Sequence, residues 1–223
     1  LKGATSEQRR SAQIFVSELC WREFYHQVLW FKPEVLSYEY SDAYRGLPWL
    51  QDPSSFSKWC EGQTGFPIVD AGMRQLRKTG FMHNRVRMIV AMFLTKDLHL
   101  DWRMGEQWFM QQLLDGEIAA NNGGWQWAAS SGCDAQPYFR IFNPTSQAEK
   151  FDGDAAYIKR WVPELSRVPA KLVHEPWEAP PLALEAAGVT LGDDYPRPIV
   201  EHGMARTRAL AALAAVSRKG VAP

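Results

Sequence analysis

Apolar residues recur along the chain at the spacing of an α-helix, and proline or glycine marks the ends of several such segments. Pro67–Thr79 begins with a proline in its first turn and stops at Gly80. Asn84–Leu98 is strongly apolar, and its inward side chains are predicted to be Val86, Ile89, Val90, Phe93 and Leu94. No stretch alternates apolar and polar residues as a half-buried strand does. The sequence therefore predicts an all-α fold.

Four further helices are expected, at Ser11–Phe31, Ser54–Glu61, Gly105–Leu114 and Tyr157–Val168. Ser11 is a suitable N-cap for the first of them, and Pro33 follows its end. This first helix carries aromatic residues on two faces, which predicts that it is buried on more than one side. Its Glu18 shares a stripe with Trp21, so an acid lies one turn from an indole.

Other segments lack a sustained period and are expected to be connections. Lys32–Pro53 is predicted to pack through its aromatic residues Tyr38, Tyr40, Tyr44 and Trp49. Pro137–Lys150 is rich in turn residues. The whole chain, residues 1–223, is expected to form one domain, in which residues 169–203 are an irregular proline-rich connection over the surface and residues 204–219 a C-terminal helix.

The stretch Asp115–Gly132, DGEIAANNGGWQWAASSG, combines acids, amides, two glycines and two indoles. Its glycines and irregular pattern predict a loop. Gly123 and Gly124 would allow a close approach of the backbone to a flat ligand, and Trp125 and Trp127 would offer aromatic surfaces beside it. A buried loop whose tryptophans fill the core is the alternative. The combination favours a ligand-binding site.

Composition and charge restrict the class of protein. Of 223 residues 46% are hydrophobic, and no apolar run is long enough for a membrane span or a signal peptide, which predicts a cytoplasmic protein without a membrane partner. Three cysteines without metal-ligand spacing predict partly buried, reduced thiols and no metal site. Net charge is zero, but residues 71–96 carry six basic side chains and no acid. This excess is either a solvated helix face or a surface for an anion.

Six motifs, taken together, resemble the flavin-binding half of the photolyase/cryptochrome family, and most of all its bacterial photolyases for cyclobutane pyrimidine dimers. They are ELCWREFY (Glu18–Tyr25), EGQTGFPIVDAGMRQL (Glu61–Leu76), GFMHNRVRM (Gly80–Met88), KDLHLDWRMGE (Lys96–Glu106), DGEIAANNGGWQWAASSGCDAQPYFRIFNP (Asp115–Pro144) and PIVEH (Pro198–His202). The resemblance runs from about Ser11 to the C-terminal helix.

The resemblance implies a helical domain that holds FAD in a U shape and a light-driven repair of pyrimidine dimers in DNA. An electron would pass from reduced flavin to a flipped-out dimer and return after the ring splits. The family's antenna chromophore belongs to an amino-terminal α/β domain, which this chain lacks together with the phosphate-binding loop that follows it. The implied protein is a monomer whose partner is damaged DNA.

Site residues follow from the resemblance position by position. Residues expected to contact FAD are Phe15, Asn84, Arg87, Asp115, Gly116, Glu117 and Asn121, with Arg87 paired to Asp115 and Asn121 facing the flavin N5. The expected electron relay consists of Trp125, Trp102 and Trp49. Glu18 and Asn121 are expected to take part in catalysis. Residues expected to hold the dimer or the DNA are Glu18, Trp21, Arg22, Tyr25, Asn84, Arg85, Met88, Trp127, Arg140 and Gln147.

Residue chemistry agrees with these roles. A dimer pocket needs apolar walls, such as Trp21, Met88 and Trp127, and polar groups for two thymine-like edges, such as Glu18 and Asn84. Three alternatives stay open. The first is a cryptochrome-type blue-light photosensor with the same flavin and tryptophans. The second is a photolyase for (6-4) lesions, for which His83 is weak support. The third is an aromatic-rich helical bundle with merely paired arginines.

Overall fold

Proline and glycine set the bounds of the first two helices of the core. In the computed structural model, which describes residues 3–134, 137 and 140–219, α2 (Pro53–Glu61) and α3 (Pro67–Thr79) both start with proline. Gly62 and Gly80 follow their last turns with φ of 67° and 66°, a left-handed conformation that side chains disfavour. The predicted bounds of α3 are confirmed, and α2 begins one residue earlier than predicted.

All named secondary-structure elements of the described residues are helical. The remaining α-helices are α1 (Ser6–Phe31), α4 (Asn84–Met92), α5 (Trp102–Gln112), α6 (Ile118–Ala129), α7 (Pro144–Phe151), α8 (Ala156–Trp161), α9 (Ala170–Val173), α10 (Pro181–Ala186) and α11 (His202–Lys219). Short 3₁₀ turns are η1 (Pro33–Leu36), η2 (Asp42–Tyr44), η4 (Pro163–Leu165) and η5 (Pro176–Glu178). Over these ranges only isolated bridges occur in place of strands, so the all-α prediction is confirmed.

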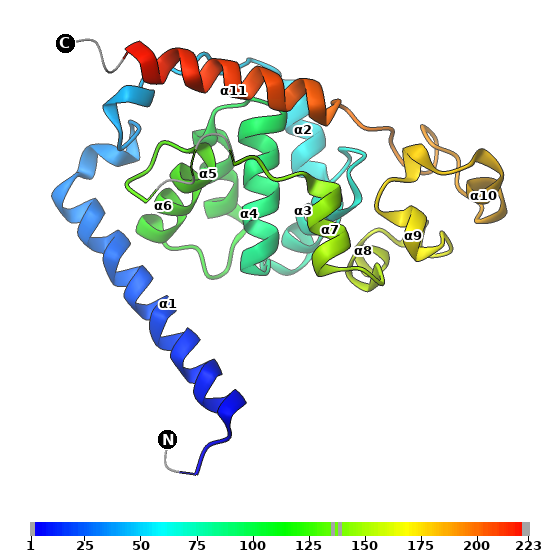
Figure 1. Ribbon diagram of the computed structural model, residues 1–223, viewed down its shortest axis with the longest axis horizontal. Coiled ribbons are helices and arrows are strands. Elements are labelled where there is room, and N and C mark those ends of the chain that lie inside the picture. Colours follow the sequence, from blue (N-terminus) through cyan, green and yellow to red (C-terminus); the bar gives the residue numbers. More distant parts are fainter. Residues whose placement is uncertain (1–2, 135–136, 138–139, 220–223) are drawn as a thin grey trace.

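The core forms where α3, α4, α5 and α6 pack together (Figure 1). The five side chains predicted to point inward from the segment 84–98 are all buried. This segment is not one regular helix, because α4 passes after Met92 into a π-helical turn, η3 (Phe93–Asp97). Three tryptophans fill the core with fully buried rings, namely Trp59, Trp102 and Trp125.

The prediction of a loop over Asp115–Gly132 is wrong, because residues 118–129 form the helix α6. The side chain of Glu117 caps this helix by accepting hydrogen bonds from the N–H groups of Ala119 and Ala120 at 2.9 and 2.8 Å. Gly123 is required for packing and not for a loop. A Cβ on Gly123 would overlap the ring of Tyr25 on α1, so that only glycine permits this contact.

The other end of α6 is held by a lysine. Lys96 in η3 is buried, and its Nζ donates to the carbonyl of Ala129 and to Ser130 Oγ, both at 2.8 Å. A positive group at a helix C-terminus and an acid at its N-terminus both interact favourably with the helix dipole. Burial lowers the pKa of Lys96 to about 7. The helix α6 is therefore bound at each end by one ionisable side chain.

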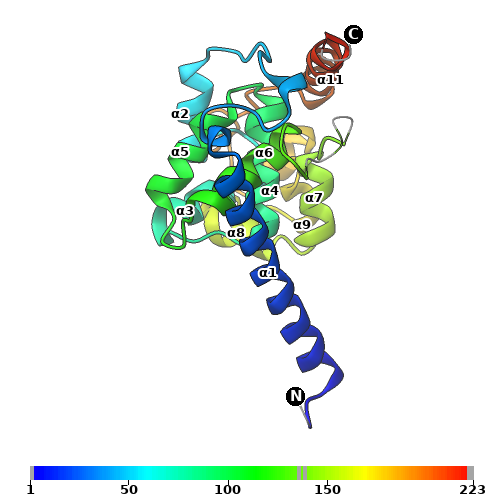
Figure 2. The same ribbon diagram turned by 90° about the vertical axis from the view of Figure 1, so that its left-hand side faces the viewer.

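The first helix differs from its prediction in length and in burial. α1 begins at Ser6, five residues before the predicted start, because Thr5 rather than Ser11 forms the cap with Gln8. No residue of α1 is buried, contrary to the prediction that two faces are covered. Figures 1 and 2 show its N-terminal half extending away from the other helices. Apolar side chains such as Phe15, which is 64% exposed, therefore face outward.

Several helices start or end at other residues than predicted, because capping side chains act where the sequence shows no helical period. Asp101 caps α5, which starts at Trp102 rather than Gly105, and Asn143 caps α7 inside the segment predicted to be turn-rich. The predicted helix at 157–168 is split into α8 and η4, since Pro163 starts a new turn. Residues 138–139 and 220–223 of the predicted segments lie outside the described residues.

The segment predicted as irregular, residues 169–203, contains α9, η5 and α10. It does not simply cover the surface, because Val173, Leu184, Val189 and Tyr195 are buried in the core. The C-terminal helix starts at His202, two residues earlier than predicted, and lies along one edge of the body in Figure 1. Predictions of packing for Tyr38 and of partial burial for Cys20 are wrong, since both side chains are exposed.

Substitution of Gly105 tests the packing of α6 on α5. A Cβ on Gly105 would overlap the ring of Trp125, which is fixed in the core. We expect Gly105→Ala to lower the free energy of unfolding by roughly 1–3 kcal/mol in urea titrations. Gly124→Ala is the control, because its Cβ meets nothing within 4 Å. We expect a change within about 1 kcal/mol there. Equal effects of both changes would contradict the close contact.

Stability should depend on pH through Lys96. Because burial lowers its pKa, the unfolded chain holds a proton on Lys96 between about pH 7 and pH 10 that the folded protein has lost. Over this range the free energy of unfolding should therefore rise with pH by about 1.4 kcal/mol per unit relative to the Lys96→Met variant. Denaturant titrations of both proteins at several pH values measure this difference, and parallel curves would show that Lys96 does not titrate there.

Candidate functional site

The residues predicted to bind a cofactor meet where α4 and α6 both begin. Arg87 of α4 donates from Nη2 to both carboxylate oxygens of Asp115, at 3.0 and 2.8 Å. Its Nε donates to the carbonyl of Met82 at 2.7 Å, which fixes the direction of the side chain. The predicted ion pair is thus present, and it joins the first turn of α4 to the turn that precedes α6. Asp115 remains half exposed, so its carboxylate also faces solvent.

Glu117 connects this corner to α1. One of its carboxylate oxygens lies 3.3 Å from Nε2 of His26, and both oxygens accept the backbone N–H bonds that cap α6. Partial burial opposes ionisation, but the N–H groups of Ala119 and Ala120 and the neighbouring His26 keep the pKa of Glu117 below its ordinary value. Glu117 is therefore a carboxylate whose hydrogen bonds are largely used within the protein.

Asn121 lies one turn further along α6. Its Nδ2 donates to the backbone carbonyl of Glu106 at 3.0 Å, and the neighbouring Asn122 donates to the Glu106 carboxylate at 2.9 Å. Burial raises the pKa of Glu106. No pattern in the sequence singles out Glu106, because it lies on α5 and meets α6 only in the folded chain. This contact fixes the orientation of the Asn121 amide and directs its Oδ1 away from α5.

α1 contributes an aromatic cluster beside α6. The ring of Tyr25 packs on Gly123, and Trp21 stacks on Tyr25 with ring centroids 6.1 Å apart. Phe24 meets the edge of Trp21 at 5.6 Å. Glu18 lies two turns before Tyr25 and is exposed, as is Arg22. Phe15 is further out on the projecting half of the helix, so that the structure does not bring it to the corner of Arg87 and Asp115.

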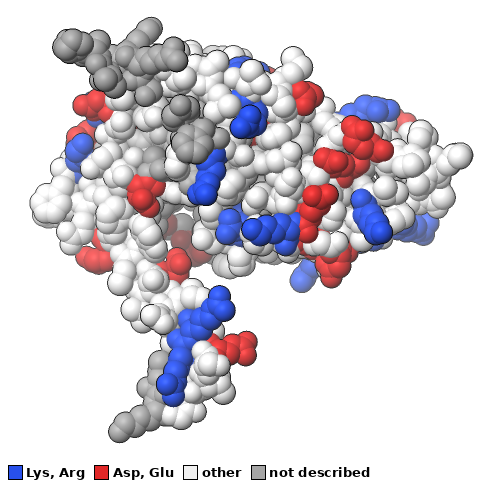
Figure 3. Space-filling view, viewed as in Figure 1, with Lys and Arg blue, Asp and Glu red and all other residues white. Residues whose placement is uncertain are grey.

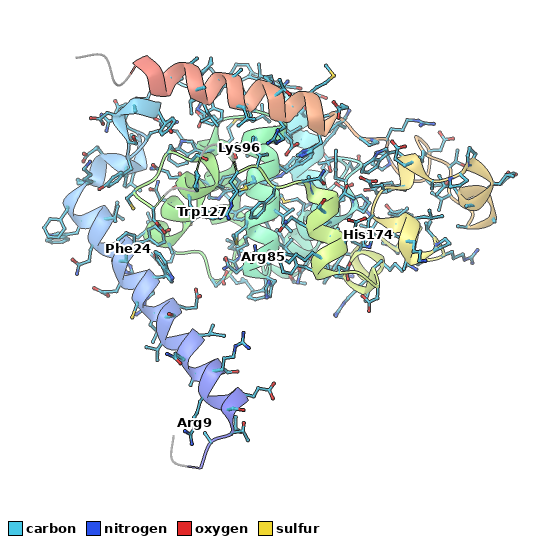
Figure 4. All side chains as sticks on the ribbon, viewed as in Figure 1. Arg9, Phe24, Arg85, Lys96, Trp127 and His174 are labelled. Carbon is cyan, nitrogen blue, oxygen red and sulfur yellow. The ribbon has the colours of Figure 1, made fainter. Side chains whose placement is uncertain are left out.

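A second group of predicted residues lies on α4 and around α7. Asn84 is exposed, Met88 and Trp127 are half-buried, and Trp127 meets the edge of Phe142 at 6.4 Å. The Arg85 guanidinium lies 4.5 Å from the ring centroid of Phe151, and Lys150 approaches the same ring. Figure 4 labels Arg85 and Lys96 toward opposite ends of the α4–η3 column, with Trp127 between their heights. Arg140 is exposed, and Gln147 is half-buried with an unbonded Oε1.

The three tryptophans predicted to relay electrons differ in depth. Trp125 and Trp102 are fully buried and Trp49 is half-buried. The ring of Trp125 packs on Gly105, one turn after Trp102 on α5. Trp49 is tied to the start of α5 because Leu50 N–H donates to the carbonyl of His99 at 2.9 Å. The three residues therefore follow one another from α6 through α5 to the connection after η2.

The face of the molecule in Figures 3 and 4 carries both basic and acidic side chains. Figure 3 shows a row of Lys and Arg side chains across its middle, near the height at which Figure 4 labels Arg85, with acidic side chains to the right. A small pocket between α1 and α6 is lined by Tyr25, Val28 and Asn122, but not by Asn121 or Trp127. Among the predicted site residues, Tyr25 is the one that lines this pocket.

Among residues 3–134, 137 and 140–219, no three His, Cys, Asp or Glu side chains are grouped as a metal ion would require. Within the same ranges no helix is both long and apolar enough to cross a bilayer.

Comparison with known proteins agrees with the sequence motifs. The family described as the FAD binding domain of DNA photolyase matches residues 15–215. The deoxyribodipyrimidine photo-lyase of Escherichia coli strain K12 is 54% identical over 211 residues, which are 94% of this chain and 43% of that protein.

Solved structures are similar along the same part of the chain. A bacterial class III photolyase from Agrobacterium tumefaciens has a TM-score of 0.92 at 52% identity, covering 97% of this chain and 44% of that one. A cryptochrome from Synechocystis sp. PCC6803 has a TM-score of 0.84 at 37% identity, covering 91% and 42%. The chain thus spans less than half the length of these relatives. Within that span, the match over residues 15–215 shows that the chain belongs to the family of FAD-binding domains of DNA photolyases.

Proposed function

We propose that this chain is the FAD- and DNA-binding part of an enzyme that splits cyclobutane pyrimidine dimers in DNA with the energy of light. The match to the photolyase domain over residues 15–215 carries the proposal, since relatives named deoxyribodipyrimidine photo-lyase are more than half identical to the chain. The arrangement around Arg87, Asp115 and Asn121 supports it. Activity of the whole protein would also depend on the residues that the longer relatives have in addition.

The chemistry of the corner between α4 and α6 fits a flavin. A Cβ on Gly124 would meet nothing within 4 Å, so a flat ring can approach the backbone of α6 at this point. Asn121 on the same helix has its amide nitrogen bonded to Glu106, which leaves Oδ1 free to accept from a ring N–H. Exposed apolar side chains of Phe81 and Ile118 supply contact surface. These features belong to a site for a planar, partly polar group.

FAD, when bound, would supply the light-driven electron chemistry, and the protein would orient it. Arg87 and Asp115 would hold its polar edge, because their bidentate pair fixes a cation and an anion side by side. Asn121 would contact the flavin ring. From the family resemblance we also assign Asn84, Gly116 and Glu117 to FAD binding, together with Phe15, which lies on α1 away from this corner and would meet another part of FAD.

The lesion would be held between α1, α4 and α6. Trp21, Met88 and Trp127 offer apolar walls, and Glu18 and Asn84 offer a carboxylate and an amide for the base edges. The aromatic stack of Trp21 on Tyr25, which itself packs on Gly123, would fix the indole beside α6. We assign Arg22 to the same wall because it neighbours Trp21 on α1.

The DNA backbone would be bound by basic and polar side chains around α7. Arg85 and Lys150 both approach the exposed ring of Phe151 and are available to phosphates. Arg140 is exposed and Gln147 of α7 is half-buried, and we assign both to DNA binding, where the guanidinium and the amide N–H groups could donate to phosphates. Such contacts would make binding weaken as the salt concentration rises.

Trp125, Trp102 and Trp49 would relay electrons toward the flavin from the surface, since they lead from the buried side of α6 to a half-buried ring. A photosensor with the same relay is the second candidate, because the Synechocystis cryptochrome has a TM-score of 0.84. Its lower identity, 37% against 52% for the class III photolyase, favours the repair enzyme. We further propose a monomeric, cytoplasmic protein.

Repair activity is the direct test. We expect the full-length protein to purify with absorbance of a flavin and, under blue light, to remove cyclobutane dimers from ultraviolet-irradiated DNA. A dark incubation is the control. Dimer loss can be measured as recovery of cleavage by a restriction enzyme at a site that contains adjacent thymines. Protein that binds FAD but leaves dimers intact under light would favour the photosensor, and protein that cannot bind FAD would contradict both.

Glu18 should matter more for damaged than for undamaged DNA, because its carboxylate is assigned to the base edges. We expect Glu18→Ala to weaken binding to a dimer-containing duplex by about 1–3 kcal/mol, or roughly 5- to 150-fold, as loss of a buried charged hydrogen bond does. Binding to the undamaged duplex should change little. Glu23→Ala on the same exposed helix is the matched control. Equal losses on both duplexes would assign Glu18 a general role in stability.

A further inference from the structure

A buried carboxylate contacts the middle tryptophan of the proposed relay. The indole N–H of Trp102 donates to Oε1 of Glu39 at 3.2 Å, and both side chains are buried. Glu39 belongs to the connection between η1 and η2, 63 residues before Trp102. No periodic pattern singled it out, and the residues expected from the sequence do not include it. The contact joins an acid to an electron-rich ring away from bulk water.

Arg103 places a positive charge beside Trp102, and Glu39 is bonded to this charge. Its guanidinium lies 4.5 Å from the ring centroid of Trp102. The two terminal nitrogens bind the two carboxylate oxygens of Glu39, at 3.2 and 3.1 Å. Asp101 accepts from the same guanidinium at 3.1 Å, but the indole N–H donates to Glu39 and not to Asp101. A positive charge therefore lies over the ring, and Glu39 is the anion that both neutralises it and reaches the ring nitrogen.

A second buried tryptophan, Trp59, offers a comparison. Its ring meets that of Trp125 edge-on with centroids 6.0 Å apart, and it also stacks on Phe109. Its N–H donates to the backbone carbonyl of Val90 at 3.1 Å, which is a neutral acceptor. Trp59 and Trp102 are equally buried, but only the indole of Trp102 is bonded to a carboxylate. Positive charge on an indole is therefore better stabilised at Trp102.

We infer that Glu39 selects Trp102 over Trp59 as the residue that passes an electron to oxidised Trp125. The inference rests on the electron relay of the proposed function. In this step Trp102 loses one electron and Trp125 gains it, no covalent bond breaks, and the indole proton stays between Nε1 and Glu39 Oε1. An electron from Trp49 then returns Trp102 to its neutral state. Glu39 thus stabilises the charge that exists on Trp102 between the two transfers.

The test uses full-length protein with bound, oxidised FAD, and follows tryptophan oxidation after a light pulse by transient absorption. Glu39→Gln keeps the size of the side chain and an acceptor oxygen but removes the charge. We expect it to slow electron transfer from Trp102 to Trp125 about tenfold or more, a change of about 1.4 kcal/mol in the barrier. Asp101→Asn is the matched control, because it leaves the indole contact in place. Its effect should stay within about threefold, as for partly exposed charges.

A readout without light tests the contact itself. The Trp102 indole N–H signal in ¹⁵N-tryptophan-labelled protein, identified by its loss in Trp102→Phe, should lie at a hydrogen-bonded shift in the wild type and in Glu39→Gln. In Glu39→Ala it should move upfield, while the signal of Trp59 stays unchanged. If the chemical shift of the Trp102 indole N–H is the same in Glu39→Ala as in the wild type, the inference is overturned.

Tryptophan substitutions separate this inference from the proposed function. If Trp102→Phe blocks photoreduction and Trp59→Phe does not, the relay is supported. Glu39→Gln at a wild-type rate would then overturn the role of Glu39 alone. If neither substitution changes photoreduction, the relay itself is wrong and the inference fails with it. If Trp59→Phe blocks photoreduction and Trp102→Phe does not, the electron passes through Trp59, whose indole is not bonded to a carboxylate. This result would contradict the selection of Trp102 by Glu39.

Discussion

The capping of α6 at both ends by ionisable side chains is the interaction on which the rest of the structure depends. Glu117 accepts hydrogen bonds from the first N–H groups of the helix, and Lys96 in the π-helical turn after α4 donates to the carbonyl of Ala129 and to Ser130 Oγ at its end. Each contact agrees with the direction of the helix dipole. The Arg87–Asp115 pair adds a third link between α4 and the start of α6. A helix with two adjacent glycines is intrinsically weak, so these fixed ends determine its position.

One helix can then serve two environments. Its inner side presents Trp125 to Gly105 of α5, where the missing Cβ allows the ring to lie against the backbone. The same helix presents Asn121, whose amide nitrogen also bonds to α5, and the open backbone at Gly124. The proposed flavin site and the first tryptophan of the proposed relay are thus fixed by the same residues. A displacement of α6 would alter both together, which accounts for the number of contacts that hold it.

Local signals were sufficient for some elements and insufficient for others. Pro67 and Gly80 determine the ends of α3 within the chain itself, and the buried face of α4 follows from its period. The helical state of residues 118–129 could not be predicted, because Gly123 is required by the ring of Tyr25 from a distant helix. Glu106 and Glu39 were missed for a related reason. Their partners, Asn121 and Trp102, meet them only through the packing of separate segments. The Arg87–Asp115 pair was predicted from the family resemblance, because no helical periodicity of the sequence indicates it.

The proposed function requires that the side of α6 with Asn121 and Gly124 holds the flavin ring. A crystal structure of the full-length protein with FAD tests it most directly. We expect an isoalloxazine ring against Gly124, within hydrogen-bond distance of Asn121, with the Arg87–Asp115 pair intact beside it. A structure in which protein covers this side of α6, or in which the ring lies away from Asn121, would contradict the account.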